Sequence, residues 1–254
     1  MKKSTGTSQQ PTRVIHYALA MVVGWTVIVV ASLSWNLNLY KSENLQIALS
    51  VARTHLEKDL LFRQWNSSHG GVYVPVTNAT PPNPYMDDLP ERDISTPSGS
   101  LLTLMNPAYM NRQVYEISVL KHQIHGHLTS LNPLRPENMA DAWEAEALKA
   151  FETGDTEYHA LKSINGKEYM RLMIPLQTRE DCLKCHANQG YIVGDVRGGI
   201  SVAMPMEPFW VAKKQTFQNI WFGHVLFWLL GMIGAGLNFI SLNKRIIERK
   251  ESQA

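Results

Sequence analysis

The two cysteines of the chain lie three positions apart and are followed directly by a histidine, in the order Cys182, Cys185 and His186. In this C-x-x-C-H spacing each thiol can bond to one vinyl group of a haem, and the adjacent imidazole can reach the iron. We therefore predict one covalently attached haem of the c type, held by Cys182 and Cys185, with His186 as the proximal ligand of the iron.

Three other kinds of site use paired cysteines, and each fits this motif less well. A redox-active dithiol normally begins a helix after a strand and lacks a histidine at this position. A zinc site needs a fourth ligand and usually a second cysteine pair. A disulfide across so short a loop would be strained. The location outside the cytoplasm, predicted below, favours haem further, because c-type haem is attached on that side.

The sixth ligand of such an iron is less clearly marked in the sequence. Met110 lies on the apolar face of a predicted helix, where a thioether can ligate iron but where a core role is more common. His69 stands beside two glycines that would allow a close approach, yet it could equally cap a turn. His127 follows a helix end together with His122 and His125, where histidines commonly complement the helix dipole. Met110 is our first candidate for the distal ligand, and His69 and His127 are alternatives.

The composition excludes several classes of protein. An apolar fraction of 44% and a charged fraction of 18% exclude a disordered chain. A net charge of +2 excludes a nucleic-acid binder that depends on neutralising phosphates. Two cysteines exclude a disulfide-rich scaffold.

Two segments without Asp, Glu, Lys or Arg, residues 14–40 and 215–243, predict membrane helices at 17–38 and 215–242. A signal peptide is the alternative for the first, but the segment is too long and no small-residue cleavage site follows it. Both tails, 1–16 and 243–254, carry an excess of basic residues, so the positive-inside rule places them in the cytoplasm. Residues 39–214 would then form an extracytoplasmic domain.

The pattern within this domain predicts an α+β fold, with an antiparallel sheet and helices on one side of it. A helix is expected over 41–65, with an apolar stripe that faces either the domain or a second copy. Proline-rich residues 75–100 predict an extended loop. Asn106-Pro107 begins a second helix and a third covers about 140–151. Asn165-Gly166 predicts a hairpin between strands 157–164 and 168–176, and a last strand includes Ile200 and Met204.

Several strings in this domain resemble a bacterial family of c-type-haem sensor domains with a PAS-like fold, long catalogued as a domain of unknown function. The resemblance covers nearly all of residues 44–206. The strings that carry it are Arg63 to Pro75, Asn106 to Gln113, Gly126 to Asn138, Trp143-Glu144, Cys182 to His186 and Gly190 to Gly199.

The resemblance implies a PAS-like sheet, one haem and His186 as its proximal ligand. In relatives the distal ligand can come from the helix that here carries Met110. Arg135 and Arg197 are candidate partners of the haem propionates, because a guanidinium pairs with a carboxylate through two hydrogen bonds. Members of this family are often extracytoplasmic input modules between two membrane helices, which implies a two-pass protein of the bacterial inner membrane with its main domain in the periplasm.

Two functions follow as expectations. The first is a redox or diatomic-gas sensor that signals through the second membrane helix to a separate cytoplasmic or membrane partner. The second is a membrane-anchored monohaem cytochrome that passes electrons to a redox partner. No residue pair identifies a haem enzyme, so we expect no catalysis. The apolar stripe of the first helix also suggests a homodimer.

Overall fold

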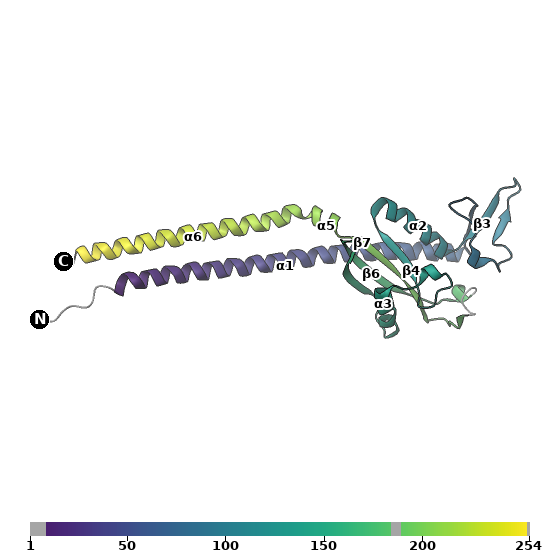
Figure 1. Ribbon diagram of the computed structural model, residues 1–254, viewed down its shortest axis with the longest axis horizontal. Coiled ribbons are helices and arrows are strands. Elements are labelled where there is room, and N and C mark those ends of the chain that lie inside the picture. Colours follow the sequence, from purple (N-terminus) through teal and green to yellow (C-terminus); the bar gives the residue numbers. More distant parts are fainter. Residues whose placement is uncertain (1–8, 184–188, 253–254) are drawn as a thin grey trace. The chain divides into compact units, whose positions relative to one another are not determined.

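The structure is a computed structural model that describes residues 9–183 and 189–252 (Figure 1). The chain forms two compact units. One unit combines the chain up to Asn44 with the chain from Trp210 onward, and the other contains Leu45–Phe209. Each unit is described by itself below.

The first unit consists of long helices. Helix α1 covers Gln9–Ser68, and its residues up to Asn44 belong here, together with the second half of α5 (Glu207–Ala212) and all of α6 (Lys214–Glu251). Val14–Ser68 and Lys214–Arg249 are both long and apolar enough to cross a membrane by length and composition. The two uncharged segments of the sequence are therefore helical, as expected.

Polar side chains connect these two helices within the first unit. Trp25 donates from Nε1 to the carbonyl oxygen of Trp228 at 3.3 Å, and Trp228 donates from its own Nε1 to Thr26 Oγ1 at 3.1 Å. Ser32 Oγ and His224 Nε2 lie 3.1 Å apart. Because unsatisfied polar groups are costly in hydrocarbon, these reciprocal bonds suit a helix pair in a membrane.

The second unit is α+β and contains two antiparallel sheets with flanking helices. A three-stranded sheet has the order β1-β3-β2, and a four-stranded sheet has the order β4-β7-β6-β5 (Figure 1). The strands are β1 (Val72–Pro75), β2 (Asp93–Ser95), β3 (Leu101–Met105), β4 (His125–Thr129), β5 (Tyr158–Ile164), β6 (Lys167–Gln177) and β7 (Val196–Pro205). The helices are α2 (Pro107–His122) and α3 (Ala142–Glu152), with short 3-10 turns at Pro84–Met86, Pro136–Asn138 and Glu180–Cys182.

Local signals predicted several of these elements correctly. The side chain of Asn106 caps α2 by accepting from the backbone N–H of Tyr109, and Pro107 occupies the first helical position. Asn165 and Gly166 connect β5 to β6 with φ values of 51° and 78°, the left-handed conformation that a two-residue type I′ hairpin requires.

The prediction of a single sheet and of an extended loop over 75–100 was wrong. This region supplies β2, and β3 begins at Leu101, so a second sheet forms apart from the first. Strand β2 has only three residues and pairs along one edge of β3. So short an edge strand offers no alternation of polar and apolar residues that a sequence could reveal.

Helices cover both faces of the four-stranded sheet, not one as predicted. Ser201 on β7 donates to Glu144 of α3 at 2.7 Å, so α3 lies on the face of Ser201. Side chains alternate along a strand, so the side chain of Val202 points to the other face. Gly126, its partner on β4, has its side-chain position on the same face as Val202. A Cβ added at Gly126 would lie 2.2 Å from the ring of Tyr115, which places α2 on that second face.

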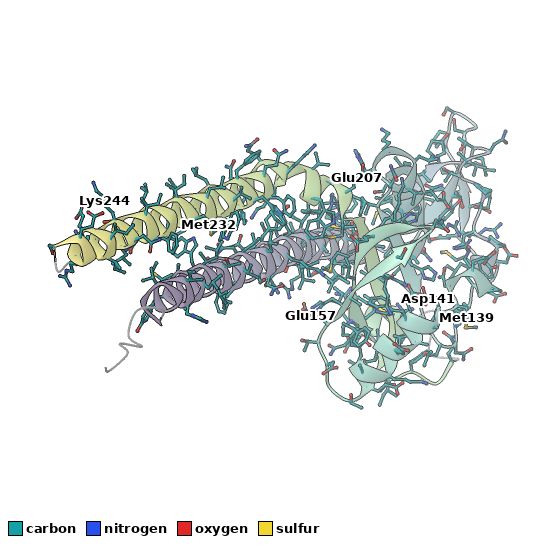
Figure 2. The ribbon with its side chains drawn as sticks, turned by 60° about the vertical axis from the view of Figure 1, so that its left-hand side comes forward. Met139, Asp141, Glu157, Glu207, Met232 and Lys244 are labelled. Atoms are coloured by element: carbon teal, nitrogen blue, oxygen red, sulfur yellow. The ribbon has the colours of Figure 1, made fainter. Side chains whose placement is uncertain are left out.

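The part of α1 in this unit buries its predicted stripe against the chain itself. Ala48, Ala52 and Leu56 are all at most 1% exposed. Arg53 donates two hydrogen bonds, of 2.6 and 2.7 Å, to Glu157 at the start of the hairpin, where Figure 2 labels the carboxylate. The stripe therefore does not need a second copy to cover it, and a homodimer stays a prediction.

Helix α3 begins with a capping box. Asp141 (labelled in Figure 2) accepts from the backbone N–H of Glu144, and the side chain of Glu144 accepts from the backbone N–H of Asp141. The apolar face of the helix packs Trp143 and Phe151 against Met173 of β6. The cap fixes the residue at which the helix starts, and so fixes the position of Glu144.

We expect Asp141→Ala to lower the free energy of unfolding by about 1 kcal/mol, because the cap of α3 is lost. Asp141→Asn is the matched control and should cost less, since the amide oxygen still accepts the same N–H. Denaturant unfolding of the detergent-solubilised full chain measures both. Asp141 also forms an ion pair with Arg171, in which Oδ2 of Asp141 lies 2.8 Å from Nη1 of Arg171. Both variants remove this ion pair, so an equal loss of stability in the two would assign the effect to the ion pair and not to the cap.

Candidate functional site

The cysteine motif lies in the connection between β6 and β7. Two backbone hydrogen bonds close the base of this loop, from Thr178 N to the oxygen of Asp195 at 2.8 Å and from Gly194 N to the oxygen of Thr178 at 2.9 Å. Cys182 ends a 3-10 turn and donates its backbone N–H to Arg179 at 3.0 Å. Cys185 and His186 lie outside the described residues. The structure therefore places the first residue of the motif and leaves the other two as sequence predictions.

Cys182 lines a pocket of about 1100 Å³ within the second unit. This volume slightly exceeds the range of about 300–1,000 Å³ that is usual for small-molecule and cofactor sites. Its apolar wall comes from α1, the three-stranded sheet and the end of β6, through Leu60, Leu104 and Leu176. The β6–β7 register shifts between Leu176 and Gln177, and both residues face the pocket. Such irregularities commonly redirect side chains beside a site.

The same pocket gathers three arginines: Arg63 from α1, Arg179 from the motif loop and Arg197 from β7. Burial lowers the pKa of Arg63 to about 10, and the positive charges of Arg197 and Arg179 add to this effect. Arg197, which the sequence analysis named as a candidate propionate partner, is among the residues that line this pocket. A flat, largely apolar group with a negatively charged edge fits such a lining.

His69 also lines the pocket, directly after the last residue of α1. Its Nδ1 lies 2.7 Å from the carbonyl oxygen of Trp65, and its ring contacts the Trp65 indole at an interplanar angle of 41°, with centroids 4.6 Å apart. A carbonyl oxygen can only accept, so Nδ1 carries the proton in this bond and Nε2 keeps its lone pair when the ring is neutral. A ring held in this way is the usual form of a metal-ligating histidine.

Two other predicted residues are not part of the pocket lining. Met110 is half-buried, and its sulfur accepts from Asn66 Nδ2 at 3.8 Å. Arg135 donates to Asn138 Oδ1 at 3.3 Å and forms an ion pair of 3.3 Å with Glu137. The structure thus brings Cys182, His69 and Arg197 together, and places Met110 and Arg135 elsewhere.

His127, the third candidate for the distal ligand, belongs to a separate network on the α3 face of the sheet. Its Nδ1 lies 2.9 Å from a carboxylate oxygen of Glu144, and its Nε2 lies 3.1 Å from the carbonyl oxygen of Glu137. Both ring nitrogens face acceptors, which suits the doubly protonated ring. Burial opposes that charge, but the hydrogen bond and charge of Glu144 outweigh burial and raise the pKa of His127.

Sequence analysis missed Arg63 and Arg179 as candidate site residues. Arg63 had a detectable signal, because it lies seven positions after Leu56 and three after Leu60, on the continuation of the apolar stripe of α1. A charged residue on a buried helical face usually has a partner or a ligand. Arg179 had no such signal, since its place depends on the course of the motif loop.

Comparisons with known proteins gave one family and one solved structure. The family model described as Tll0287-like matches residues 42–205. The structure described as the cyanobacterial heme-protein Tll0287 is similar at a TM-score of 0.40 and 17% identity, covering 62% of this chain and 94% of that one. No curated protein matches the chain.

The pair of His127 and Glu144 predicts a pH dependence of stability. Because the pKa of His127 is raised on folding, its stabilisation is complete below the unfolded value of about 6.5 and is lost as the pH rises through the folded value. The pKa of Glu144 is lowered despite burial, mainly by the bond to His127, so its stabilisation is lost only as the pH falls through a value below 4.5.

We therefore expect His127→Gln to lose about 1 kcal/mol of unfolding free energy at pH 5.5 and clearly less at pH 8.5. Denaturant unfolding of the full chain at the two pH values measures the difference. His122→Gln is the control, because His122 is exposed on the last turn of α2. A loss that does not depend on pH would show that His127 is not charged in the fold.

Proposed function

The chain belongs to the Tll0287-like family, whose model spans residues 42–205, and we propose that it is a membrane-anchored haem protein of the c type that acts as a sensor. The family takes its name from Tll0287, which is described as a cyanobacterial heme-protein. The C-x-x-C-H motif of this chain extends that description to covalent attachment.

One observation carries the proposal: Cys182 lies in the wall of a pocket of about 1100 Å³ whose lining combines apolar side chains with three arginines. A solvent-exposed dithiol or a zinc site would need neither the volume nor the arginines. A porphyrin needs both, because it is a flat apolar ring with two carboxylates. The residues present therefore fit the cofactor that the motif predicts.

We assign the attachment to Cys182 and Cys185 and the proximal ligand to His186, as the motif implies. His69 is the distal candidate that the pocket favours, because it lines the cavity and its Nδ1–H is committed to Trp65. Bound haem would supply an iron that changes oxidation state or takes up a diatomic gas.

A sensing role is supported by the way in which His69 is held. It is exposed, and it is followed by Gly70 and Gly71, which both have positive φ. His69 adjoins the last residue of α1, so a change in its ligation would act directly on the end of that helix. We propose that this change is the event that is passed on through the membrane helices to a separate partner.

The proposed location is a bacterial inner membrane, with the haem domain in the periplasm. The two apolar helices and the basic tails of the chain support a two-pass arrangement. The antiparallel sheet with its flanking helices is compatible with a PAS-like fold, which we propose on the family resemblance. No role as an enzyme is included in the proposal.

Covalent attachment is tested by replacing the motif residues. Cys182→Ala with Cys185→Ala should abolish the haem that stays with the polypeptide on a denaturing gel, and His186→Ala should abolish the normal low-spin spectrum. Lys184→Ala is the matched control, because it leaves the C-x-x-C-H spacing intact. The proposal would be refuted by covalent haem in the variant that lacks both cysteines. It would also be refuted by the absence of haem in the wild-type chain.

The distal ligand and the sensing role are tested together by absorption spectra of the reduced protein with and without carbon monoxide. We expect the gas to replace a weak sixth ligand in the wild-type protein, and His69→Ala to give a five-coordinate reduced iron before the gas is added. Met110→Ala should behave as the wild type. Low-spin bands that the gas does not change would instead indicate an electron carrier, and a five-coordinate Met110→Ala would transfer the ligand role to Met110.

A further inference from the structure

Arg63, Arg179 and Arg197 all line the pocket, and the charges of Arg197 and Arg179 act on Arg63, so the three guanidinium groups lie in the same part of the cavity. Among the described residues that line the pocket, Glu91 is the one acidic residue, and it is exposed to solvent. Three guanidinium groups therefore share this cavity with one solvent-exposed carboxylate. Arg179 is exposed like Glu91, whereas Arg63 and Arg197 are half-buried. Like charges in partly desolvated positions are stabilised by a negative group, so the lining suits an anionic ligand.

Arg63 has the surroundings that argue most strongly for such a ligand. Its Nη1 is buried and has no hydrogen-bond partner within residues 9–183 and 189–252, where it also forms no ion pair. Asp59 lies one turn earlier on α1 and its charge acts on Arg63, but its carboxylate forms no ion pair with Arg63 and instead accepts a 2.6 Å hydrogen bond from the hydroxyl of Tyr115. A buried guanidinium nitrogen without an acceptor is costly, and in a native fold it points to a group other than the protein.

The positively charged form of Arg63 is also destabilised by its surroundings when no ligand is bound. Burial and the charges of Arg197 and Arg179 lower its pKa to about 10, well below its ordinary value. The side chain stays protonated at neutral pH all the same. A carboxylate at this end of the pocket would reverse both effects, because it would replace the lost water and oppose the neighbouring charges.

We infer that Arg63, together with Arg179 and Arg197, forms the carboxylate-binding end of this pocket and holds the propionates of the haem. This role for the arginines rests on the proposed function. The sequence resemblance had already suggested Arg197, whereas Arg63 and Arg179 are assigned to the role from the structure. Arg63 carries most of the argument, because its buried Nη1 has no hydrogen-bond partner among the described residues.

The arrangement has a chemical consequence for the haem. A guanidinium binds a carboxylate through two parallel N–H···O bonds and lowers its pKa by roughly one to three units. The propionates would therefore stay ionised across the neutral pH range. Three donors from α1, the motif loop and β7 would also set the orientation of the ring, which the two thioether bonds alone fix only at one edge.

The test is the midpoint potential of the full-length holoprotein as a function of pH, for the wild type and for Arg63→Gln. We expect a midpoint that is nearly constant between pH 5 and 8 in the wild type. In Arg63→Gln the propionate pKa should rise by roughly one to three units, so that the midpoint increases as the pH falls through this range. Arg63→Lys keeps the charge but not the planar fork, and should show a smaller change in the same direction.

Arg112→Gln is the matched control, because Arg112 lies on α2 over the ring of Tyr109 and is not part of the pocket lining. It should keep the wild-type profile. Equal covalent haem and an equal pH profile in the wild type and Arg63→Gln would overturn this inference alone. A wild-type chain without covalent haem would overturn the proposed function itself. If Arg63→Gln does not fold, Arg179→Gln tests the same end of the pocket, and an unchanged profile there would equally overturn the inference.

Discussion

The second unit is organised around one buried carboxylate, that of Glu144, which is 1% exposed. It receives a hydrogen bond from Ser201 on β7, lies 2.9 Å from His127 on β4, and lies 3.3 Å from Arg171 on β6. A charge taken out of water is tolerated only when its partners replace the lost hydration. Glu144 therefore fixes α3 to three neighbouring strands at once. Two of these strands, β6 and β7, carry the motif loop at their ends, so the position of the pocket wall depends on this contact.

The pocket itself joins segments that are far apart in the chain. The end of α1 supplies Arg63 and His69, and the end of β6 and the start of β7 supply the motif loop and Arg197. The hydrogen bond between Asp59 and Tyr115 connects α1 to α2, and burial raises the pKa of Asp59 even though Tyr115 donates to it. Polar contacts of this kind specify one arrangement of the helices, whereas apolar contacts alone would allow several.

Features that depend on neighbouring residues could be predicted from the sequence. The cap at Asn106, the hairpin turn at Asn165-Gly166 and the spacing of Cys182, Cys185 and His186 are all local patterns. Features that depend on distant residues could not. The role of His127 is decided by Glu144, seventeen positions away, and the short β2 exists only because β3 offers an edge. Arg63 lies between these cases, since its spacing from Leu56 and Leu60 continues the apolar stripe of α1 but indicates no partner.

The two backbone bonds that join Thr178 to Gly194 and Asp195 separate the motif loop from the sheet that carries it. Strands β6 and β7 are paired up to this point without any contribution from the residues inside the loop. The closure entropy of a loop changes slowly with its length. Evolution could thus lengthen, shorten or replace the cysteine-bearing segment while the scaffold stays the same, and a relative without the motif could keep the fold and use the pocket for a different occupant.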